Sequence, residues 1–389
     1  MMYFDYCAST PVNPEVLDIF CAVSKNMYAN PSSVHKLGYQ ASSLIEESRE
    51  KISKLFKIAP SEIVFTSGAT ESNNLAILGV VRASRKVFAS PHIIISAIEH
   101  SSVYSCAEYL KKDNVEVTIL PVDSNGLVSI KQLEESLKEN TVLVSIMYAN
   151  NETGVIQPIK EIGEMLKLHN QVSFHVDGVQ AVGKMEIALG SIDLFTFSGH
   201  KIGGPKGIGA LIVKSNTVIA PIIWGGGQEY GIRPGTENVP AIASLAHAVE
   251  ICILEQLSRT RHLQDIHHYI YNEIRSIPEL EINSPRGHLC APHILNFSYR
   301  GVPSSISINI LTQKGILVSS QSACSSKSNK FSRVLLAITN DKDIASSSIR
   351  LSFSEATTFS DADVLLQEIQ DMVKQIKTNG KYSYAHYSA

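Results

Sequence analysis

Several features of secreted, membrane-spanning and nucleic-acid-binding proteins are missing from this sequence. Its 6 cysteines are scattered over 389 residues without a Cys-x-x-Cys pair, which argues against a disulfide framework and a zinc-binding pattern. No apolar run reaches the roughly 18 residues that a membrane-spanning helix needs. No run of like charges reaches five residues, and 34 basic side chains nearly balance 37 acidic ones. The sequence therefore offers no basic surface for nucleic acid or lipid.

The composition is that of a globular protein. Apolar residues make up 44% and charged residues 18%, so most of the chain can form a packed core. Residues 1–14 contain neither a basic stretch nor an apolar stretch of the secretory type. We expect a cytoplasmic protein without a metal site, and without a membrane or nucleic acid as a direct partner. At about 100–200 residues per domain, the length predicts two or three domains.

Short apolar runs alternate with amphipathic segments as far as residue 213. Several runs are almost continuously apolar, as buried parallel strands are. The expected strands are Ile63–Thr66, Ile93–Ile98, Val115–Leu120, Val142–Tyr148, Val172–Val176, Leu194–Phe197 and Ile208–Val213. The expected helices are Glu71–Ala83, Ser101–Lys112, Ile130–Lys138 and Ile159–His169. This alternation predicts an α/β fold with a mostly parallel seven-stranded sheet.

The pattern changes after Asn238. Residues 239–276 show helical periodicity almost without interruption, and a shorter mixture of strands and helices follows. The later segments are Ile294–Ser298, Ile306–Leu311, Ile316–Ser319, Ser348–Ser352 and Ala362–Ile376. We predict a large domain over residues 15–257 and a smaller α+β domain formed by residues 1–14 and 258–389.

Two strand ends carry a lysine and an aspartate in settings suited to catalysis. Lys201 lies in a glycine-rich turn, where a partly neutral amine can form a Schiff base; a surface lysine is the alternative. Asp177 follows the buried strand 172–176. An aspartate in such a place is the recurring partner of the pyridine nitrogen of pyridoxal 5'-phosphate (PLP), although a turn cap has the same pattern.

Two more strand ends suit the phosphate and the ring of such a cofactor. Thr70 lies where a helix begins, and free N–H groups there attract a phosphate, although an ordinary helix cap looks alike. His100 can stack on the ring and move protons, unless it is structural. Since parallel strands end at one edge of a sheet, we expect Thr70, His100, Asp177 and Lys201 to meet.

Three other residues suit substrate chemistry. Asn151 follows an expected strand, and its amide suits a carboxylate or a phenolic oxygen. Arg350 lies in a short late strand, where it can bind a carboxylate or form a structural ion pair. Cys324 lies among small polar residues near Lys327, as either a reactive thiol or an incidental surface cysteine.

Together these residues resemble the cysteine desulfurases of the NifS/IscS type, which are PLP enzymes of fold type I related to class-V aminotransferases. The resemblance extends from about Tyr3 to about Met372. The segments that carry it are Ser67-Gly-Ala-Thr-Glu-Ser-Asn-Asn-Leu75, Ser198-Gly-His-Lys-Ile-Gly-Gly-Pro-Lys-Gly207, Gly225-Gly-Gly-Gln-Glu229 with residues 233–240, and Ser322-Ala-Cys-Ser325. The last segment, in a loop at about 319–329, resembles the group I branch.

The resemblance implies a role for each residue. Lys201 forms the Schiff base, Asp177 pairs with the pyridine nitrogen, and His100 stacks on the ring and shuttles protons. Cys324 is the nucleophile that takes the substrate sulfur as a persulfide, and Arg350 binds the substrate carboxylate. The other implied contacts are Ala69, Thr70, Ser198 and His200 at the phosphate, Gln180 at the ring hydroxyl, Asn151 near ring and substrate, and Thr236 at the phosphate of the neighbouring subunit.

The implied reaction removes sulfur from L-cysteine and leaves L-alanine. The implied partners are a second copy of the chain, in a homodimer, and a sulfur-acceptor protein for iron–sulfur cluster assembly or tRNA thiolation. A selenocysteine lyase, a class-V aminotransferase and an inactive sulfur-trafficking scaffold are the alternatives. An aminotransferase would not need Cys324, and an inactive relative would not need Lys201.

The sequence departs in three places from the pattern that the family usually shows. Residues 5–10 read Asp-Tyr-Cys-Ala-Ser-Thr in place of Asp-Asn-Ala-Ala-Thr-Thr. Gln321 replaces a common glycine, which should stiffen the loop that carries the cysteine. Tyr230 stands where arginine is frequent. None of these changes removes an implied catalytic residue, but the last two bear on sulfur delivery and on the dimer.

Overall fold

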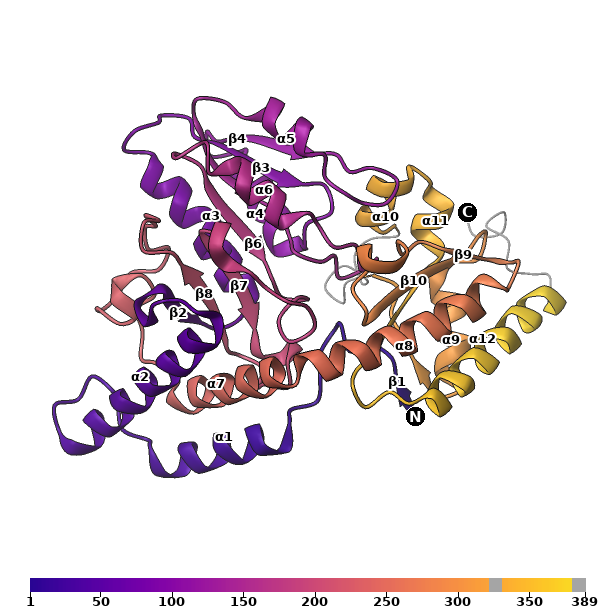
Figure 1. Ribbon diagram of the computed structural model, residues 1–389, viewed down its shortest axis with the longest axis horizontal. Helices are drawn as coiled ribbons and strands as arrows, with labels where there is room; N and C mark the ends of the chain where they lie inside the picture. Colours follow the sequence, from indigo (N-terminus) through magenta and orange to yellow (C-terminus); the bar gives the residue numbers. More distant parts are fainter. Residues whose placement is uncertain (322–330, 380–389) are drawn as a thin grey trace.

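The computed structural model describes residues 1–321 and 331–379, so Cys324 lies outside the described residues. A seven-stranded sheet forms the larger part of the molecule (Figure 1). Its strands, in spatial order, are β2 (Ile63–Thr66), β8 (Gly209–Val213), β7 (Leu194–Ser198), β6 (Ser173–Asp177), β5 (Thr141–Ser145), β3 (His92–Ser96) and β4 (Glu116–Leu120). Only β8 runs antiparallel to its neighbours, which confirms the predicted mostly parallel sheet.

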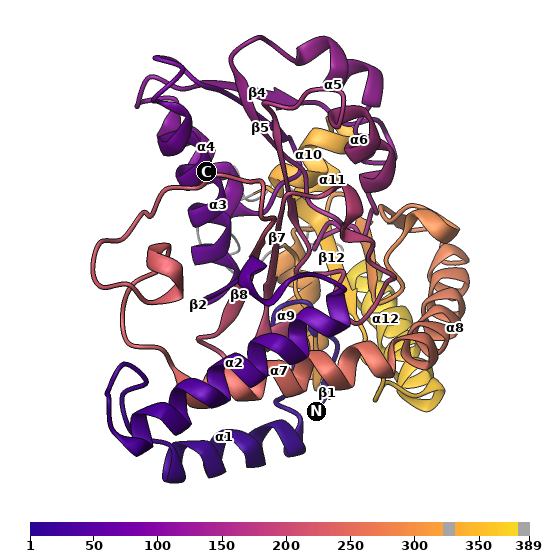
Figure 2. The same cartoon turned by 60° about the vertical axis from the view of Figure 1, so that its left-hand side comes forward.

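Helices cover both faces of this sheet (Figure 2). They are α1 (Pro14–Asn26), α2 (Lys36–Phe56), α3 (Ala69–Ser84), α4 (Ser101–Leu110), α5 (Ile130–Ser136), α6 (Ile159–Leu166) and α7 (Val239–Leu254). Alternate strand residues point to opposite faces: Phe195 and Phe197 pack with α2, α6 and α7, whereas Leu194 packs with α3 and α4. Burial on both sides explains why the strands read as continuous apolar runs.

The pattern analysis did not predict α1 and α2, which lie against α7 (Figure 1). In α2 the buried apolar side chains Ala41, Ile45 and Ile52 recur at helical spacing. The rest of the helix is strongly polar, because its outer face is exposed. Because few apolar residues mark the helical spacing among many polar ones, the pattern analysis did not detect this helix.

A second hydrophobic cluster is formed by Phe4 and by residues between 263 and 376. Its strands are β9 (Leu280–Ile282), β10 (Ile294–Tyr299) and β12 (Ser348–Ser352), with β10 in the middle, and β1 (Met2–Tyr3) pairs with β11 (Ile316–Leu317). Its helices are α8 (Gln256–Arg275), α9 (Ser304–Gln313), α10 (Arg333–Thr339), α11 (Lys342–Ser347) and α12 (Phe359–Asn379). The domain limits at 15–257 and 258–389 stay a prediction.

The segment 239–276, where helical periodicity is almost uninterrupted in the sequence, forms two helices, α7 and α8. The axes of α7 and α8 differ by 66°, and Glu255 at the break has a φ of −92° and a ψ of 0°. The two halves bury against different cores: Leu245 of α7 packs on the sheet, and Ile266 of α8 packs in the second cluster. Within the described ranges, no single helix is long and apolar enough to cross a membrane, although this bent pair passes that test jointly.

Candidate active site

A cavity of about 420 Å³ lies where β2, β3, β6 and β7 end. Every predicted cofactor-binding residue except Thr236 lines it, together with Arg350 from β12. The lining set comprises Ala69, Thr70, His100, Asn151, Asp177, Gln180, Ser198, His200 and Lys201. The structure therefore brings the four predicted strand ends together at one edge of the sheet.

One end of the cavity is suited to a phosphate. Helix α3 begins at Ala69 without a side-chain cap, so the N–H groups of its first turn lack intrahelical acceptors. Gly68 before it has a φ of 149°, a conformation that side chains disfavour. Thr70, Ser198 and His200 lie beside this turn, and burial lowers the pKa of His200 to about 4. Neutral donors and the positive end of a helix dipole favour an anion here.

Lys201 ends a short 3-10 turn that follows β7 (Gly199–Lys201). Its Nζ donates to the carbonyl oxygens of Cys7 and Ala8, at 2.9 Å for Ala8. Burial penalises the charged form and lowers the pKa of Lys201 to about 8. A large fraction of the amine is therefore neutral at mildly alkaline pH, as a Schiff-base lysine requires.

Asp177 and His100 are joined by a chain of hydrogen bonds. The carboxamide of Asn73 on α3 donates to Asp177 Oδ2 at 2.8 Å and to Ser102 Oγ at 2.9 Å. The Ser102 hydroxyl lies 2.8 Å from His100 Nδ1, and the Ser102 backbone N–H donates to the same nitrogen at 3.2 Å. Asn73 and Ser102 therefore hold the two groups in fixed positions.

This chain also fixes the proton on His100. Burial lowers the pKa of His100, so the imidazole is neutral at pH 7. Because Nδ1 accepts the Ser102 backbone N–H, the single ring proton lies on Nε2. His100 thus combines a role as the N-cap of α4 with a place in the cavity wall, and the structural and functional interpretations of this residue are compatible.

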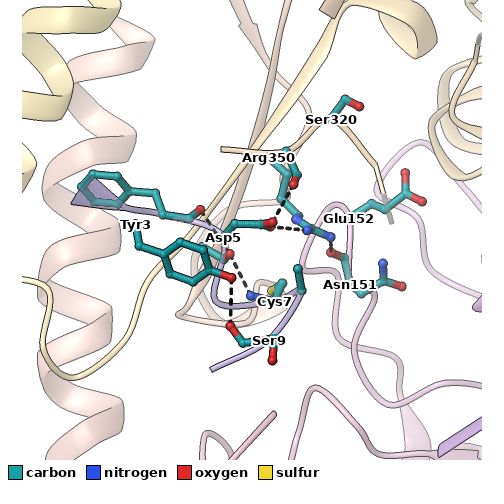
Figure 3. Close-up of polar contacts among 12 residues, drawn as sticks. Tyr3, Asp5, Cys7, Ser9, Asn151, Glu152, Ser320 and Arg350 are labelled. Atoms are coloured by element: carbon teal, nitrogen blue, oxygen red, sulfur yellow. Dashed lines mark hydrogen bonds and ion pairs between the residues drawn. The ribbon is translucent and has the colours of Figure 1, made fainter. Parts of the chain in front are cut away.

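Arg350 is buried in the cavity wall, where it forms an ion pair with Asp5 of the N-terminal segment (Figure 3). Its Nη2 donates to Asp5 Oδ1 at 2.6 Å, and its Nη1 donates to the carbonyl oxygen of Asn151 at 2.9 Å. Its Nε has no hydrogen-bond partner among the described residues. The guanidinium therefore forms a structural ion pair and still has donors for a carboxylate.

The described residues on either side of 322–330 are attached near the same cavity. On the N-terminal side, Ser319 donates to Asp5 Oδ2 at 2.7 Å. On the C-terminal side, Ser332 donates to Glu152 Oε2 at 2.5 Å, and Arg333 donates to the carbonyl oxygen of Glu99. The described residues that flank the predicted nucleophile in sequence are thus attached beside the site.

Comparison with known proteins identifies the family. The class-V aminotransferase family matches residues 2–365. The chain belongs to this family. It is 40% identical over 375 residues to the "NifS/IcsS protein homolog" of Lactobacillus delbrueckii subsp. bulgaricus, covering 96% of this chain and 97% of that one. It is 39% identical to "Cysteine desulfurase IscS" of Dictyoglomus turgidum, covering 98% and 96%.

A solved "NIFS-LIKE PROTEIN" superimposes with a TM-score of 0.89 at 35% identity, covering 96% of this chain and 99% of that one. This likeness confirms the predicted fold type I architecture. The chain is a PLP-dependent class-V enzyme of the cysteine desulfurase group.

The residues of this class-V site fit PLP. The Asp177 carboxylate is buried and accepts hydrogen bonds only from Asn73 and from the Val179 N–H; within the described ranges no cationic side chain pairs with it. A buried carboxylate needs a positive partner, and a protonated pyridine nitrogen supplies one. The anion-binding turn, the lysine of lowered pKa and this carboxylate match the phosphate, the aldehyde and the ring nitrogen of PLP.

The remaining predicted residues lie away from the cavity. Thr236 is exposed and does not line the cavity of its own chain, so its contact with a neighbouring subunit stays a prediction. Gln321 is buried at the border of the undescribed segment. Tyr230 adopts a left-handed conformation with a φ of 60° and lies 5.2 Å from the Arg49 guanidinium.

The sequence analysis missed Asn73, Ser102 and Asp5 as parts of the site. Asn73 lies one helical turn after Thr70, on the face of α3 that meets the sheet, and its buried polar side chain was the available signal. Ser102 and Asp5 resemble ordinary capping residues, and only the fold shows their partners.

Proposed function

We propose that this enzyme removes the sulfur of L-cysteine, releases L-alanine, and passes the sulfur from Cys324 to an acceptor protein. The observation that carries the proposal is the single cavity in which Lys201, Asp177, His100 and Arg350 meet. The relatives named cysteine desulfurase support the choice of substrate. The loop attachments beside the cavity support a nucleophile from the segment 322–330.

When bound, PLP supplies an electron sink for the carbon atoms next to the substrate amine. Arg350 binds the substrate carboxylate with the donors that Asp5 and Asn151 leave available. Lys201 would hold the cofactor's aldehyde group, and its lowered pKa favours the neutral amine, which can accept a proton. His100 carries a proton on Nε2, and Asp177 stabilises the positive charge on the ring nitrogen.

Cys324 completes the reaction. Its thiolate attacks the substrate sulfur, so that a sulfur–sulfur bond forms while the carbon–sulfur bond breaks and its electron pair stays on the carbon. A proton then joins that carbon, and the balance is one L-cysteine and one thiol converted into one L-alanine and one persulfide. Lys327, close to Cys324 in sequence, favours the thiolate form.

The proposal includes a cytoplasmic homodimer in which Thr236 reaches the phosphate of the other subunit. Its support is the loop before α7, where Thr236 lies close in sequence to the exposed apolar side chains Ile223 (44% exposed) and Trp224 (71% exposed). Exposed aromatic side chains mark a surface that another chain covers. For the sulfur acceptor we propose an iron–sulfur scaffold or a tRNA-thiolation enzyme.

The test is incubation of the PLP-loaded enzyme with L-cysteine and a thiol reductant. We expect alanine and sulfide in equal amounts. Cys324→Ser should keep the cofactor and its absorbance change with cysteine but lose sulfide release, whereas Cys21→Ser, at an exposed position on α1, should behave as the parent. Parental turnover by Cys324→Ser would exclude this nucleophile.

The same assay separates the alternatives. Turnover of selenocysteine with almost none of cysteine would indicate a lyase, and amino transfer without sulfide an aminotransferase. Failure of the parent chain to take up PLP would indicate an inactive scaffold.

A further inference from the structure

His293 is a buried histidine that neither the motifs nor the reaction described above use. It directly precedes β10, with 1% of its surface exposed, and its Nε2 lies 3.1 Å from Oε1 of Gln180. Gln180 is also buried, follows β6, and lines the cofactor cavity. The contact joins the second hydrophobic unit of the molecule to the cavity at the sheet edge.

The orientation of the Gln180 carboxamide is set by its other neighbour. Gln180 Nε2 lies 3.4 Å from the carbonyl oxygen of Cys7, which can only accept a hydrogen bond. The amide nitrogen must therefore face Cys7, and Oε1 must face His293. The Cys7 thiol, 3.6 Å from the same Oε1, is a second donor to it.

The proton of His293 follows from this orientation. Burial, with Lys184, His267 and Arg350 nearby, holds the pKa of His293 well below its usual value, so the ring carries one proton. Its Nδ1 has no partner among the residues that the structure describes, whereas Nε2 faces an acceptor. The proton therefore lies on Nε2 and is donated to Gln180.

We propose that His293 is a positioning residue that holds the Gln180 carboxamide so that its NH2 group, and not its carbonyl oxygen, faces the ring hydroxyl of PLP. The inference rests on the proposed function, because the role of Gln180 at that hydroxyl comes from the family resemblance. Without the His293 donor, only the longer contacts with Cys7, at 3.4 Å and 3.6 Å, hold the carboxamide. It then rotates more easily and can place an acceptor where the phenolic oxygen needs a donor. Such a change weakens the binding of PLP and raises the proton affinity of its phenolic oxygen.

The test compares His293→Leu, which removes the donor, with His293→Gln, whose amide nitrogen lies close to the position of the imidazole Nε2. We expect His293→Leu to bind PLP about fivefold more weakly. We also expect the midpoint of the pH titration of its visible absorption band to rise. His293→Gln should stay close to the parent in both. If His293→Leu does not fold, His293→Asn, which is too short to reach Oε1, replaces it.

A double-mutant cycle tests whether the effect of His293 acts through Gln180 or through a general disturbance of the fold. In a Gln180→Leu background, the change at His293 should leave PLP affinity and the titration midpoint unaltered. Equal effects in both backgrounds, or a parental titration for His293→Leu, would overturn the inference while the parent still releases sulfide. Loss of sulfide release in the parent chain would instead refute the proposed function.

Discussion

Replacing Arg49 by methionine should destabilise the protein by about 3–5 kcal/mol, because it leaves a carboxylate buried without its cation. Arg49 on α2 and Glu229 are each only 3% exposed at the side chain, and two hydrogen bonds of 2.8 and 3.0 Å join them. Arg49 also donates to the carbonyl oxygen of Ile63 at 2.7 Å, and the Phe65 N–H donates to Glu229 at 2.8 Å. Methionine fills a similar volume but donates neither to the Glu229 carboxylate nor to the Ile63 carbonyl oxygen.

The assay is urea denaturation at fixed protein and PLP concentrations, followed by circular dichroism. The matched control is Glu46→Ala, which removes an exposed partner of Arg49 at 3.2 Å and should cost no more than about 0.5 kcal/mol. Adding Glu229→Leu to the Arg49 variant should recover part of the loss, since no buried charge then remains. If the free energy of unfolding of Arg49→Met equals that of the control, the buried Arg49–Glu229 pair does not stabilise the contact between β2 and the turn Glu229–Gly231.

Three further predictions concern the site. The rate of PLP uptake by the cofactor-free protein should rise with pH with a midpoint near 8, because protonated Lys201 cannot react; a midpoint near 10.5 would contradict the lowered pKa. Ser102→Ala removes the hydroxyl between Asn73 and His100 and should lower kcat about tenfold, whereas Ser101→Ala at the same helix start should not; equal effects would separate the network from catalysis. Asp177→Ala should weaken PLP binding and slow turnover by at least about 100-fold, and near-parental rates would refute the ion pair with the ring nitrogen.

Local patterns predicted the sheet and its functional edge because most of its strands are buried on both faces; only the edge strand β4 is largely half-exposed. The run 63–66 matches β2, and the residues that follow four strands meet in one cavity. The periodicity of segment 239–276 did not show the break at Glu255, because its two halves pack in different cores and that division depends on contacts distant in sequence.

The site divides in the same way. Lys201 and Asp177 stand out because glycines or apolar runs flank them. Asp5 and Ser102 have no such context, since their partners are brought by other elements: Arg350 by β12 and Asn73 by α3. Of the two interpretations of Arg350, the structure supports the ion pair with Asp5 directly, and the guanidinium keeps donor hydrogens that its two contacts do not use.

The pairing of the first residues with late ones has a consequence for synthesis. Asp5 and Arg350 are 345 positions apart, and Cys7 and Ala8 hold the amine of Lys201. A nascent chain still on the ribosome can complete the sheet long before its leading residues find their places. The reactive lysine and the arginine are therefore assembled only after translation has almost finished, so an interrupted polypeptide carries no working desulfurase. Proteolytic removal of residues 1–8 should likewise abolish the activity of the enzyme while the larger hydrophobic core stays folded.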